Sequence, residues 1–365
     1  MPNGTSRLFE TQSAPDKFRH LLDRRDVLKI WGRLFTGYKP FLSIEITREC
    51  PLRCPGCYAY ELQHLHGVLL RQLSDYRKDD LIRRVFALVD ELRPLHVSIV
   101  GGDPLIRFRE LTEILPGLSR RRIGVFLVTS AFRKIPDSWF SLPGLDIVVS
   151  IDGLQPEHDV RRKPATYERI LQNIAGNQIT VHCTVTSSMV RPAYLEEFLC
   201  FWTNRPEAKR IWMSLFTPQR GATDVEILNP DQRRFVIQEL VRLAEFYPKL
   251  DMNREIMEAF LHPPVRPEDC AFARVTETIS ADLKTRITPC QFGGDPDCSQ
   301  CGCIAAMALA RIGRHQPVRG LNALTILKTS SLVGDRSRRI RSALSSAGAE
   351  CDPCGSDAAN SSIPS

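Results

Sequence analysis

The chain has 365 residues, of which 43% are hydrophobic and 25% are charged, and its formal net charge is +7. This composition is typical of a globular protein and excludes global disorder, and the length suits one large domain or two ordinary ones. No apolar run approaches the roughly 20 residues that a membrane helix needs, and the first residues lack the apolar centre of a secretory signal. We therefore expect a cytoplasmic protein without a membrane span.

The positive charge is concentrated near the C-terminus. Between Cys303 and Glu350 the only acidic residue is Asp335, against eight Lys or Arg. The rest of the chain is close to neutral, so its charge says little about nucleic acid, which we do not expect as a partner. We interpret the basic stretch as a solvated helix or tail, with contact to an acidic partner as the alternative.

Strand and helix patterns alternate along most of the chain. The first forty residues are polar, with an amphipathic stretch over 18–35, and predict an N-terminal extension that packs on a core. Six apolar, β-branched runs then predict strands over 41–47, 96–100, 124–129, 146–151, 180–186 and 211–216. Helical patterns begin at 79–80 and cover 110–118, 166–174, 194–203 and 231–246.

Six strands separated by helices imply a parallel sheet with right-handed crossovers. A closed barrel would need eight such units, so we predict an α/β fold with a partial (β/α)6 TIM-like barrel. An open doubly wound sheet is the alternative. In both folds, ligands bind at the C-terminal ends of the strands.

Ten of the twelve cysteines are bunched at short spacings, which favours metal or cluster ligation over disulfides in a reducing cytosol. Cys183, in a strand pattern, and Cys200, in a helix pattern, are isolated, and we interpret both as small buried apolar residues. Residues 347–365 are small and polar and predict a disordered end, apart from any role for Cys351 and Cys354.

Three cysteines directly follow the first predicted strand. Cys50, Cys54 and Cys57 have the spacing C-x3-C-x2-C. Three thiolates hold three irons of a cubane iron–sulfur cluster and leave the fourth iron open for chemistry. A zinc knuckle is the alternative, and it would need a fourth ligand from a distant part of the chain.

This triplet resembles that of the radical S-adenosylmethionine (SAM) superfamily. In that family the three cysteines hold a 4Fe–4S cluster, and SAM chelates the fourth iron. Reductive cleavage of SAM then gives a 5′-deoxyadenosyl radical that abstracts a hydrogen atom from a substrate. Relatives often have an aromatic residue before the last cysteine, where this chain has Gly56 and then Tyr58. Tyr58 is therefore a candidate for covering the adenine.

The end of the second predicted strand supports the resemblance. Gly101, Gly102 and Asp103, followed by Pro104, resemble the family's Gly-Gly-Glu-Pro segment, with Asp in place of Glu. Glycines let a backbone approach a ligand closely. The resemblance implies that this edge binds the SAM amino group.

The end of the fourth predicted strand carries a further match. Ser150, Asp152 and Arg162 lie in a segment that resembles the family pattern Ser-x-Asp-Gly … His-Asp-x-x-Arg. The resemblance places Ser150 near the ribose and Arg162 near the SAM carboxylate, which a guanidinium binds in bidentate fashion. We interpret His158 and Asp159 first as a helix-start cap. His182, in the fifth strand, either faces substrate or is a hydrogen-bonded core histidine.

A second cysteine-rich region resembles the SPASM or twitch extensions that follow many radical SAM cores. Those begin with a cysteine, a hairpin and Pro-Cys, and continue with a Cys-x2-Cys pair. The resemblance implies one auxiliary 4Fe–4S cluster, with structural zinc as the alternative. Its expected ligands are Cys270, Cys290, Cys298, and either Cys301 or Cys303. The family's glycine before the second cysteine is missing here.

The resemblance implies a radical SAM enzyme that acts on a peptide or a small molecule and receives electrons from a donor such as flavodoxin or ferredoxin. Adenosyl transfer to a lipid-like substrate and a zinc-binding interaction module are the alternatives. The expected divisions are an N-terminal extension (1–40), a radical SAM core (41–225), an auxiliary cluster domain (226–313) and a basic, partly disordered tail (314–365).

Overall fold

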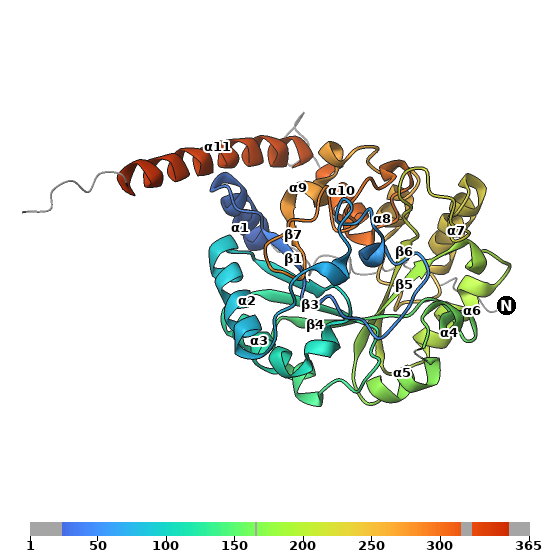
Figure 1. The fold of residues 1–365 in the computed structure, drawn as a ribbon. Helices are drawn as coiled ribbons and strands as arrows, with labels where there is room; N and C mark the ends of the chain where they lie inside the picture. The colour runs from blue at the N-terminus through green and yellow to red at the C-terminus, as the bar shows by residue number, and fades with distance from the viewer. Residues whose placement is uncertain (1–23, 165, 315–322, 350–365) are drawn as a thin grey trace, which may run out of the picture.

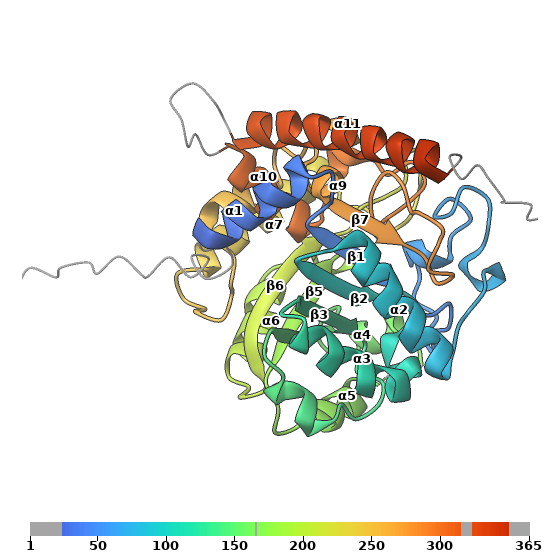
Figure 2. The same cartoon turned by 90° about the vertical axis from the view of Figure 1, so that its left-hand side faces the viewer.

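The computed structural model describes residues 24–164, 166–314 and 323–349. Its centre is a curved, fully parallel sheet of seven strands in the order β6-β5-β4-β3-β2-β1-β7, which does not close into a barrel (Figures 1 and 2). The strands are β1 (Phe41–Glu45), β2 (His96–Val100), β3 (Gly124–Thr129), β4 (Leu145–Ser150), β5 (Ile179–Val185), β6 (Ala208–Leu215) and β7 (Thr276–Ile279). The prediction of an α/β partial barrel is confirmed.

The six predicted strands agree with β1 to β6 to within three residues at each end. The sequence shows a strand-like run after Cys270, but a seventh strand in the central sheet was not predicted. β7 has only four residues and lies in the second cysteine-rich region, yet it pairs in parallel with β1, from Phe41 opposite Thr276 to Ile44 opposite Ile279. A run this short has no periodicity to recognise, so only the pairing with β1 defines it as a strand of the central sheet.

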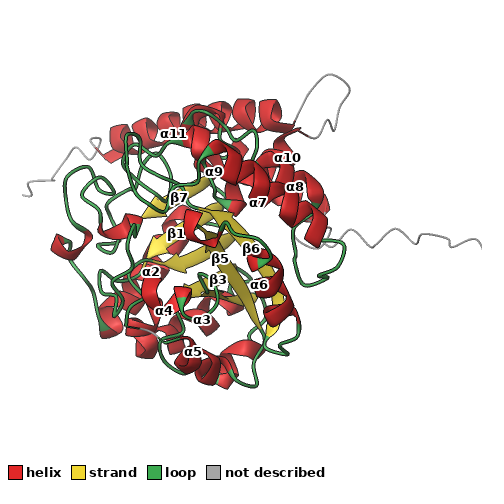
Figure 3. Cartoon of the chain, turned by 90° about the vertical axis from the view of Figure 1, so that its right-hand side faces the viewer, coloured by secondary structure: helices red, strands yellow, loops and turns green. Residues whose placement is uncertain are grey.

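Helices surround the sheet (Figure 3). They are α1 (Arg24–Phe35), α2 (Lys78–Leu92), α3 (Phe108–Arg120), α4 (Glu157–Arg161), α5 (Tyr167–Ile174), α6 (Tyr194–Thr203), α7 (Pro230–Leu243), α8 (Arg254–Ala259), α9 (Ala271–Val275), α10 (Ile304–Arg314) and α11 (Ala323–Ala349). Local signals explain several starts. Asp79 and Asp80 lie in the first turn of α2, where carboxylates are stabilised by the helix dipole, and Asn229 forms a capping box with Gln232 at the start of α7.

The core lies on both faces of the sheet. Ile44, Ile99, Leu127 and Val149, from four neighbouring strands, are fully buried in one continuous hydrophobic cluster. Alternate residues of a strand point to opposite faces, so burial along β1 and β4 means that both faces are covered. None of the described helices is long and apolar enough to cross a membrane.

The two ends of the described chain lie side by side. α11 crosses the top of the molecule next to α1 (Figure 2). Gly334 of α11 approaches α1 so closely that a Cβ on it would stand 1.9 Å from the carbonyl oxygen of Leu34. The predicted amphipathic stretch over 18–35 is therefore helical and packed from residue 24 onward. The end predicted to be disordered, with Cys351 and Cys354, lies outside the described residues from 350.

Candidate active site

The cysteine triplet lies in the loop after β1, at the C-terminal edge of the sheet. Cys50, Cys54 and Cys57 are free and partly buried. Burial raises the pKa of Cys50 to about 12 and that of Cys57 to about 11. Burial also raises the pKa of Cys54, while Arg162 opposes that shift. Thiols held this way need a strongly positive partner to become thiolates, and iron is such a partner.

The three cysteines are not grouped as the ligands of a single metal ion. In the described ranges, no three Cys, His, Asp or Glu side chains are grouped so that they could hold one metal ion. A cubane cluster instead takes one thiolate on each iron atom. Three thiols in one loop at the sheet edge therefore fit the three-cysteine ligation expected from the sequence.

The segment Gly101–Asp103 after β2, here called the glycine edge, contacts the backbone that leads into the cysteine triplet. Gly101 has φ +80°, and a Cβ on it would stand 2.2 Å from the Cβ of Glu45. A Cβ on Gly102 would stand 2.0 Å from the carbonyl oxygen of Glu49. The amide of Asp103 donates to the same Glu49 carbonyl at 2.9 Å. Only glycine allows this approach, and it fixes the edge against the residue before Cys50.

The side chain of Asp103 points into the protein. Its carboxylate is buried and accepts from Thr129 Oγ1 at 2.7 Å, from the Ser130 amide at 2.8 Å and from the Leu105 amide at 3.0 Å. Burial raises the pKa of this carboxyl group. Asp103 therefore joins the ends of β2 and β3, and the backbone of the Gly101–Asp103 segment is what remains to meet a ligand.

Two arginines share the carboxylate of Asp152 after β4. Arg161 Nη1 donates to Asp152 Oδ2 at 2.5 Å, Arg162 Nε donates to the same oxygen at 2.7 Å, and the Thr184 amide donates to Oδ1 at 3.0 Å. Burial opposes ionisation, but Arg162 and Arg161 outweigh it and hold the pKa of Asp152 well below its usual range. Asp152 is thus a buried anion that orients Arg162 beside Cys54.

Arg161 was not among the residues predicted from the sequence, although it is adjacent to Arg162. Its guanidinium also pairs with both oxygens of Glu226, at 2.8 and 2.9 Å. Glu226 lies in the loop after β6, and its carboxylate stands 3.0 Å from where a Cβ on Gly56 would be. Arg161 therefore ties the loop after β6 to the turn after β4, and Glu226 lies against the cysteine loop at Gly56. The sequence signal that could have identified Arg161 was its position next to Arg162, which matches the family pattern.

Ser150 and His182 lie opposite each other on neighbouring strands at the same edge. Ser150 is buried at the end of β4. His182 Nε2 lies 2.8 Å from Ser214 Oγ, and burial lowers the pKa of the imidazole to about 4. His182 is hydrogen-bonded but only partly buried, so both interpretations of it remain.

The expectation that His158 and Asp159 cap a helix start is wrong for α4, which has no side-chain cap. His158 is fully buried, and its Nδ1 accepts from the Asp152 amide at 3.1 Å. Asp159 Oδ1 accepts from the Tyr167 amide at 2.6 Å, at the start of the next helix. His158 therefore holds the turn that carries Asp152, whereas Asp159 caps the start of α5.

Comparison with known proteins agrees with this geometry. Residues 44–198 match the family model of the radical SAM superfamily, from β1 into α6. This part of the chain, less than half of its length, is a radical SAM domain. A radical SAM domain implies an iron–sulfur enzyme with SAM and a 4Fe–4S cluster as cofactors. No curated protein sequence matches the chain.

Solved structures share the fold. Streptococcus suis SuiB has a TM-score of 0.51 at 16% identity, with 70% of this chain and 62% of SuiB covered. SuiB bound to its precursor peptide SuiA has a TM-score of 0.51 at 14% identity, covering 89% and 78%. Native anSMEcpe with bound AdoMet and Cp18Cys peptide has a TM-score of 0.50 at 15% identity, covering 69% and 74%. In the first alignment the chain spans less than two thirds of the SuiB chain.

Tyr58 follows the triplet of the radical SAM domain, and its ring faces the second cysteine-rich region. The ring centroid lies 5.1 Å from that of Phe292 and 5.4 Å from that of His64. His64 is fully buried, with Nε2 2.8 Å from Glu45 Oε1 and Nδ1 2.9 Å from the Phe292 carbonyl oxygen. No local pattern signals this link, because it joins residues more than 200 positions apart.

The second cysteine-rich region forms one cavity beside the radical SAM domain. Apolar residues, among them Phe272 and Phe292, line most of it. Its walls include all five candidate ligands: Cys270, Cys290, Cys298, Cys301 and Cys303. Burial raises the pKa of Cys290 and Cys303 to about 12 and that of Cys298 to about 11. The structure therefore brings together five thiols from a stretch of 34 positions.

One residue that fixes this cavity was missed in the sequence. Arg233 of α7 donates to the carbonyl oxygens of Phe260 at 2.9 Å, Gln300 at 3.0 Å and Cys301. The expected hairpin is present as an antiparallel bridge between Ile279 and Arg286.

The two isolated cysteines behave differently from each other. Cys183 is buried in the core, as predicted, and burial raises the pKa of its thiol. Cys200 is exposed on α6, so the burial predicted for it is wrong. The helix pattern around Cys200 is apolar, but this position faces away from the sheet.

A polar hollow of about 340 Å³ lies where the loop after β6, the loop after the cysteine triplet and the second cysteine-rich region meet. Arg220 pairs with Asp295 at 3.2 Å on its wall. Glu61 and Asp224 lie on the same wall, and burial and Asp224 raise the pKa of Glu61.

Proposed function

We propose that this chain cleaves SAM reductively at a 4Fe–4S cluster held by Cys50, Cys54 and Cys57, and that it abstracts a hydrogen atom from a peptide or small-molecule substrate. The observation that carries the proposal is the placement of three thiols between a glycine edge and an arginine pair on a buried carboxylate, at the C-terminal edge of a parallel sheet. When bound, cluster and SAM supply the radical chemistry.

The residues around the cysteine triplet would bind and orient SAM. The backbone of Gly101, Gly102 and Asp103 would accept hydrogen bonds from the amino group. Arg162 uses its Nε on Asp152, which leaves its terminal N–H groups for the SAM carboxylate. Asp152 stays ionised and keeps this guanidinium in place.

Two further residues are assigned by resemblance. Ser150 would contact the ribose, and its burial at the end of β4 is compatible with that role. Tyr58 remains the proposed aromatic neighbour of the adenine, although its ring also packs on Phe292.

We also propose an auxiliary 4Fe–4S cluster in the second cavity, with Cys270, Cys290, Cys298 and either Cys301 or Cys303 as ligands. The support is that all five thiols line one cavity. Structural zinc is the competing occupant, and iron, sulfide and zinc analysis of the purified protein separates the two. The proposed auxiliary domain (226–313) includes β7, which pairs with β1 of the radical SAM core (41–225).

For the substrate, a peptide is the first choice. SuiB has been crystallised with its precursor peptide SuiA and anSMEcpe with the Cp18Cys peptide, and both share this fold. The polar hollow beside the second cavity offers carboxylates and amides to a polar chain. We further propose a cytoplasmic location and an electron donor such as flavodoxin or ferredoxin.

The decisive experiment measures 5′-deoxyadenosine after anaerobic reduction with SAM. We expect the wild-type protein to produce it and Cys54→Ala to produce none. Cys200→Ala, which changes an exposed cysteine on α6, is the matched control and should keep full production. Production by Cys54→Ala at the wild-type level would overturn the proposal.

A further inference from the structure

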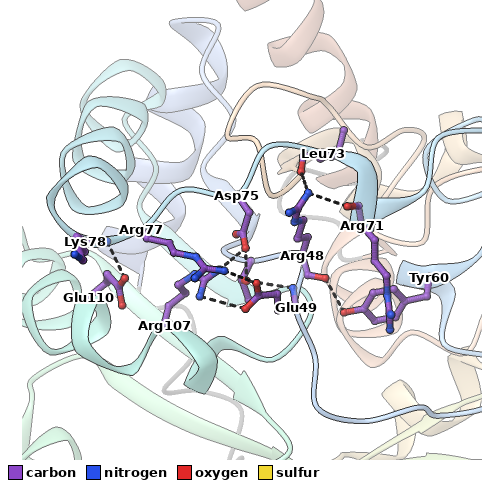
Figure 4. Close-up of polar contacts among 11 residues, drawn as sticks. Arg48, Glu49, Tyr60, Arg71, Leu73, Asp75, Arg77, Lys78, Arg107 and Glu110 are labelled. Atoms are coloured by element: carbon purple, nitrogen blue, oxygen red, sulfur yellow. Dashed lines mark hydrogen bonds and ion pairs between the residues drawn. The ribbon is translucent and has the colours of Figure 1, made fainter.

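Arg107 lies immediately behind the glycine edge. It ends the short 3-10 helix Pro104–Arg107 that follows Asp103, and its side chain is only 5% exposed. Figure 4 shows its guanidinium between two carboxylates. It forms an ion pair with Asp75 and a longer one with Glu49 Oε2, at 3.5 Å. This arginine belongs to neither the cysteine motif nor the SAM motifs.

Glu49 is the residue before Cys50, and both its backbone and its side chain are held. Its carbonyl oxygen accepts from the Asp103 amide at 2.9 Å. Its carboxylate contacts Arg107 and also Arg77 Nη2 at 2.5 Å (Figure 4). The entry to the cysteine loop is therefore bound by the glycine edge through the backbone and by Arg107 through the side chain.

Asp75 provides the other half of the contact. Its side chain is 2% exposed, and its Oδ2 accepts from Arg107 and from Thr47 Oγ1, the latter at 3.3 Å. Asp75 Oδ1 and Arg107 Nε are buried without a hydrogen-bond partner among the described residues. Since a buried charge is stabilised by its counter-charge, each of the two residues depends on the other.

The segment Arg71–Lys78, here called the strap, is tied to the cysteine loop at further points. Arg48 Nη1 donates to the carbonyl oxygens of Arg71 at 2.8 Å and Leu73 at 2.6 Å. Tyr60, which follows the triplet, donates from its hydroxyl to the Arg48 carbonyl oxygen at 3.0 Å (Figure 4). The strap thus contacts the residues before Cys50, which Tyr60 also holds.

We propose that Arg107 is a positioning residue of the radical SAM site: by pairing with Asp75 of the strap and with Glu49, it sets the cysteine loop against the glycine edge. This inference rests on the proposed function, since it assumes that the two edges bind one cluster and one SAM molecule. Losing Arg107 leaves Asp75 as a buried, unpaired carboxylate and frees the entry to the loop. The cysteines stay present, but their placement relative to Gly101 and Gly102 becomes variable.

The test compares Arg107→Met with the wild-type protein after anaerobic reconstitution. SAM affinity and the change that SAM causes in the electron paramagnetic resonance spectrum of the reduced cluster are the readouts. We expect SAM affinity to fall at least tenfold and the spectral change to shrink, with iron bound by the triplet reduced. Arg83→Met removes an exposed arginine that pairs with Asp80 and should match the wild type.

A double variant separates positioning from stability. Arg107→Met with Asp75→Leu removes the unpaired carboxylate, so thermal stability should recover while SAM affinity stays low. Recovery of both would show a merely structural role and overturn the inference. If Arg107→Met does not fold, Arg107→Lys replaces it, because a lysine keeps the charge but cannot span both carboxylates. SAM affinity equal to wild type in that variant would also overturn the inference.

The same measurements distinguish this inference from the proposed function. A wild-type protein that binds neither SAM nor a cluster contradicts the proposed function itself. A wild-type protein that binds both, together with unchanged SAM affinity in Arg107→Met, contradicts only the positioning role.

Discussion

A Cβ on Gly102 would stand 2.0 Å from the carbonyl oxygen of Glu49, so the glycine edge and the entry to the cysteine loop are in direct backbone contact. Gly102 also has a positive φ of 42°. We expect Gly102→Ala to lower stability by more than the roughly 1–2 kcal/mol that left-handed backbone costs other residues, because the Cβ also displaces the loop. Thermal unfolding and SAM titration measure both effects.

The control for that substitution is Gly32→Ala. Gly32 lies inside α1, and a Cβ on it would have nothing within 4 Å. Alanine should therefore stabilise the helix by about 1 kcal/mol or leave it unchanged. Gly102→Ala with wild-type stability and SAM affinity would show that the edge is not constrained as described.

We expect SAM binding to be weakened even when Arg162 is replaced by lysine. Its Nε is occupied by Asp152 at 2.7 Å, and a lysine has no second set of donors for the SAM carboxylate. Arg162→Lys should weaken SAM binding at least about tenfold, or about 1.4 kcal/mol, in calorimetric titration. Arg191→Lys, at an exposed ion pair with Glu157, is the control and should bind SAM normally. Equal affinity in the two variants would rule out the contact.

Asp152 is expected to contribute to folding as well as to the site. Asp152→Asn leaves Arg162 buried without its counter-charge, whereas Arg161 keeps Glu226. Breaking a buried pair by removing one partner costs about 3–5 kcal/mol. Urea unfolding of the cluster-free protein should show a loss of this order, and Asp80→Asn at the exposed pair with Arg83 should show almost none. Similar losses in the two variants would contradict the role of Asp152.

The second cavity predicts a change in iron content. With one cluster in each site the protein should hold about eight iron atoms per chain, and Cys290→Ala should reduce this to about four. Single alanine variants of Cys301 and Cys303 should show which one is the fourth ligand. Cys183→Ala changes a core cysteine outside the cavity and should keep the full iron content. About four iron atoms in the wild type, with zinc present, would favour the zinc alternative.

A partly buried histidine far from the site predicts pH-dependent stability. Burial lowers the pKa of His96 to about 4, against about 6.5 in an unfolded chain. Because protonation then favours the unfolded state, stability is full above pH 6.5 and is lost as the pH falls toward 4. Between pH 7 and 5 this one group should remove about 2 kcal/mol.

His96→Phe tests this dependence, since the ring lies between Phe126 at 4.3 Å and Phe41 at 6.3 Å and a phenyl ring suits that place. Urea unfolding of cluster-free protein at pH 7 and pH 5 should show a smaller difference in the variant. His158 and His182 keep a similar dependence, because the pKa of each is lowered to about 4. An unchanged difference would show that His96 is protonated in the fold.

Much of the fold and of the site was predictable from local pattern. The six strands have apolar, β-branched runs of their own, and the residues that follow them must meet at one edge of a parallel sheet. The sequence alone therefore predicted that Cys50, Gly101 and Arg162 lie at the same C-terminal edge of the sheet. It also showed the second group of cysteines, because close spacing is visible without a structure.

The directions in which side chains point could be determined only from the tertiary structure. Asp103 turns inward to Thr129 and Ser130, and Arg107 reaches Asp75, which is 32 positions away in the chain. β7 is a strand only because β1 lies beside it. The sequence by itself determined which chemical groups gather at the strand ends, since that follows from topology. Only the packed structure decided which of them face a ligand and which bind one another, because buried side chains such as Asp103 and Asp75 pair with residues that the fold brings near from distant parts of the chain.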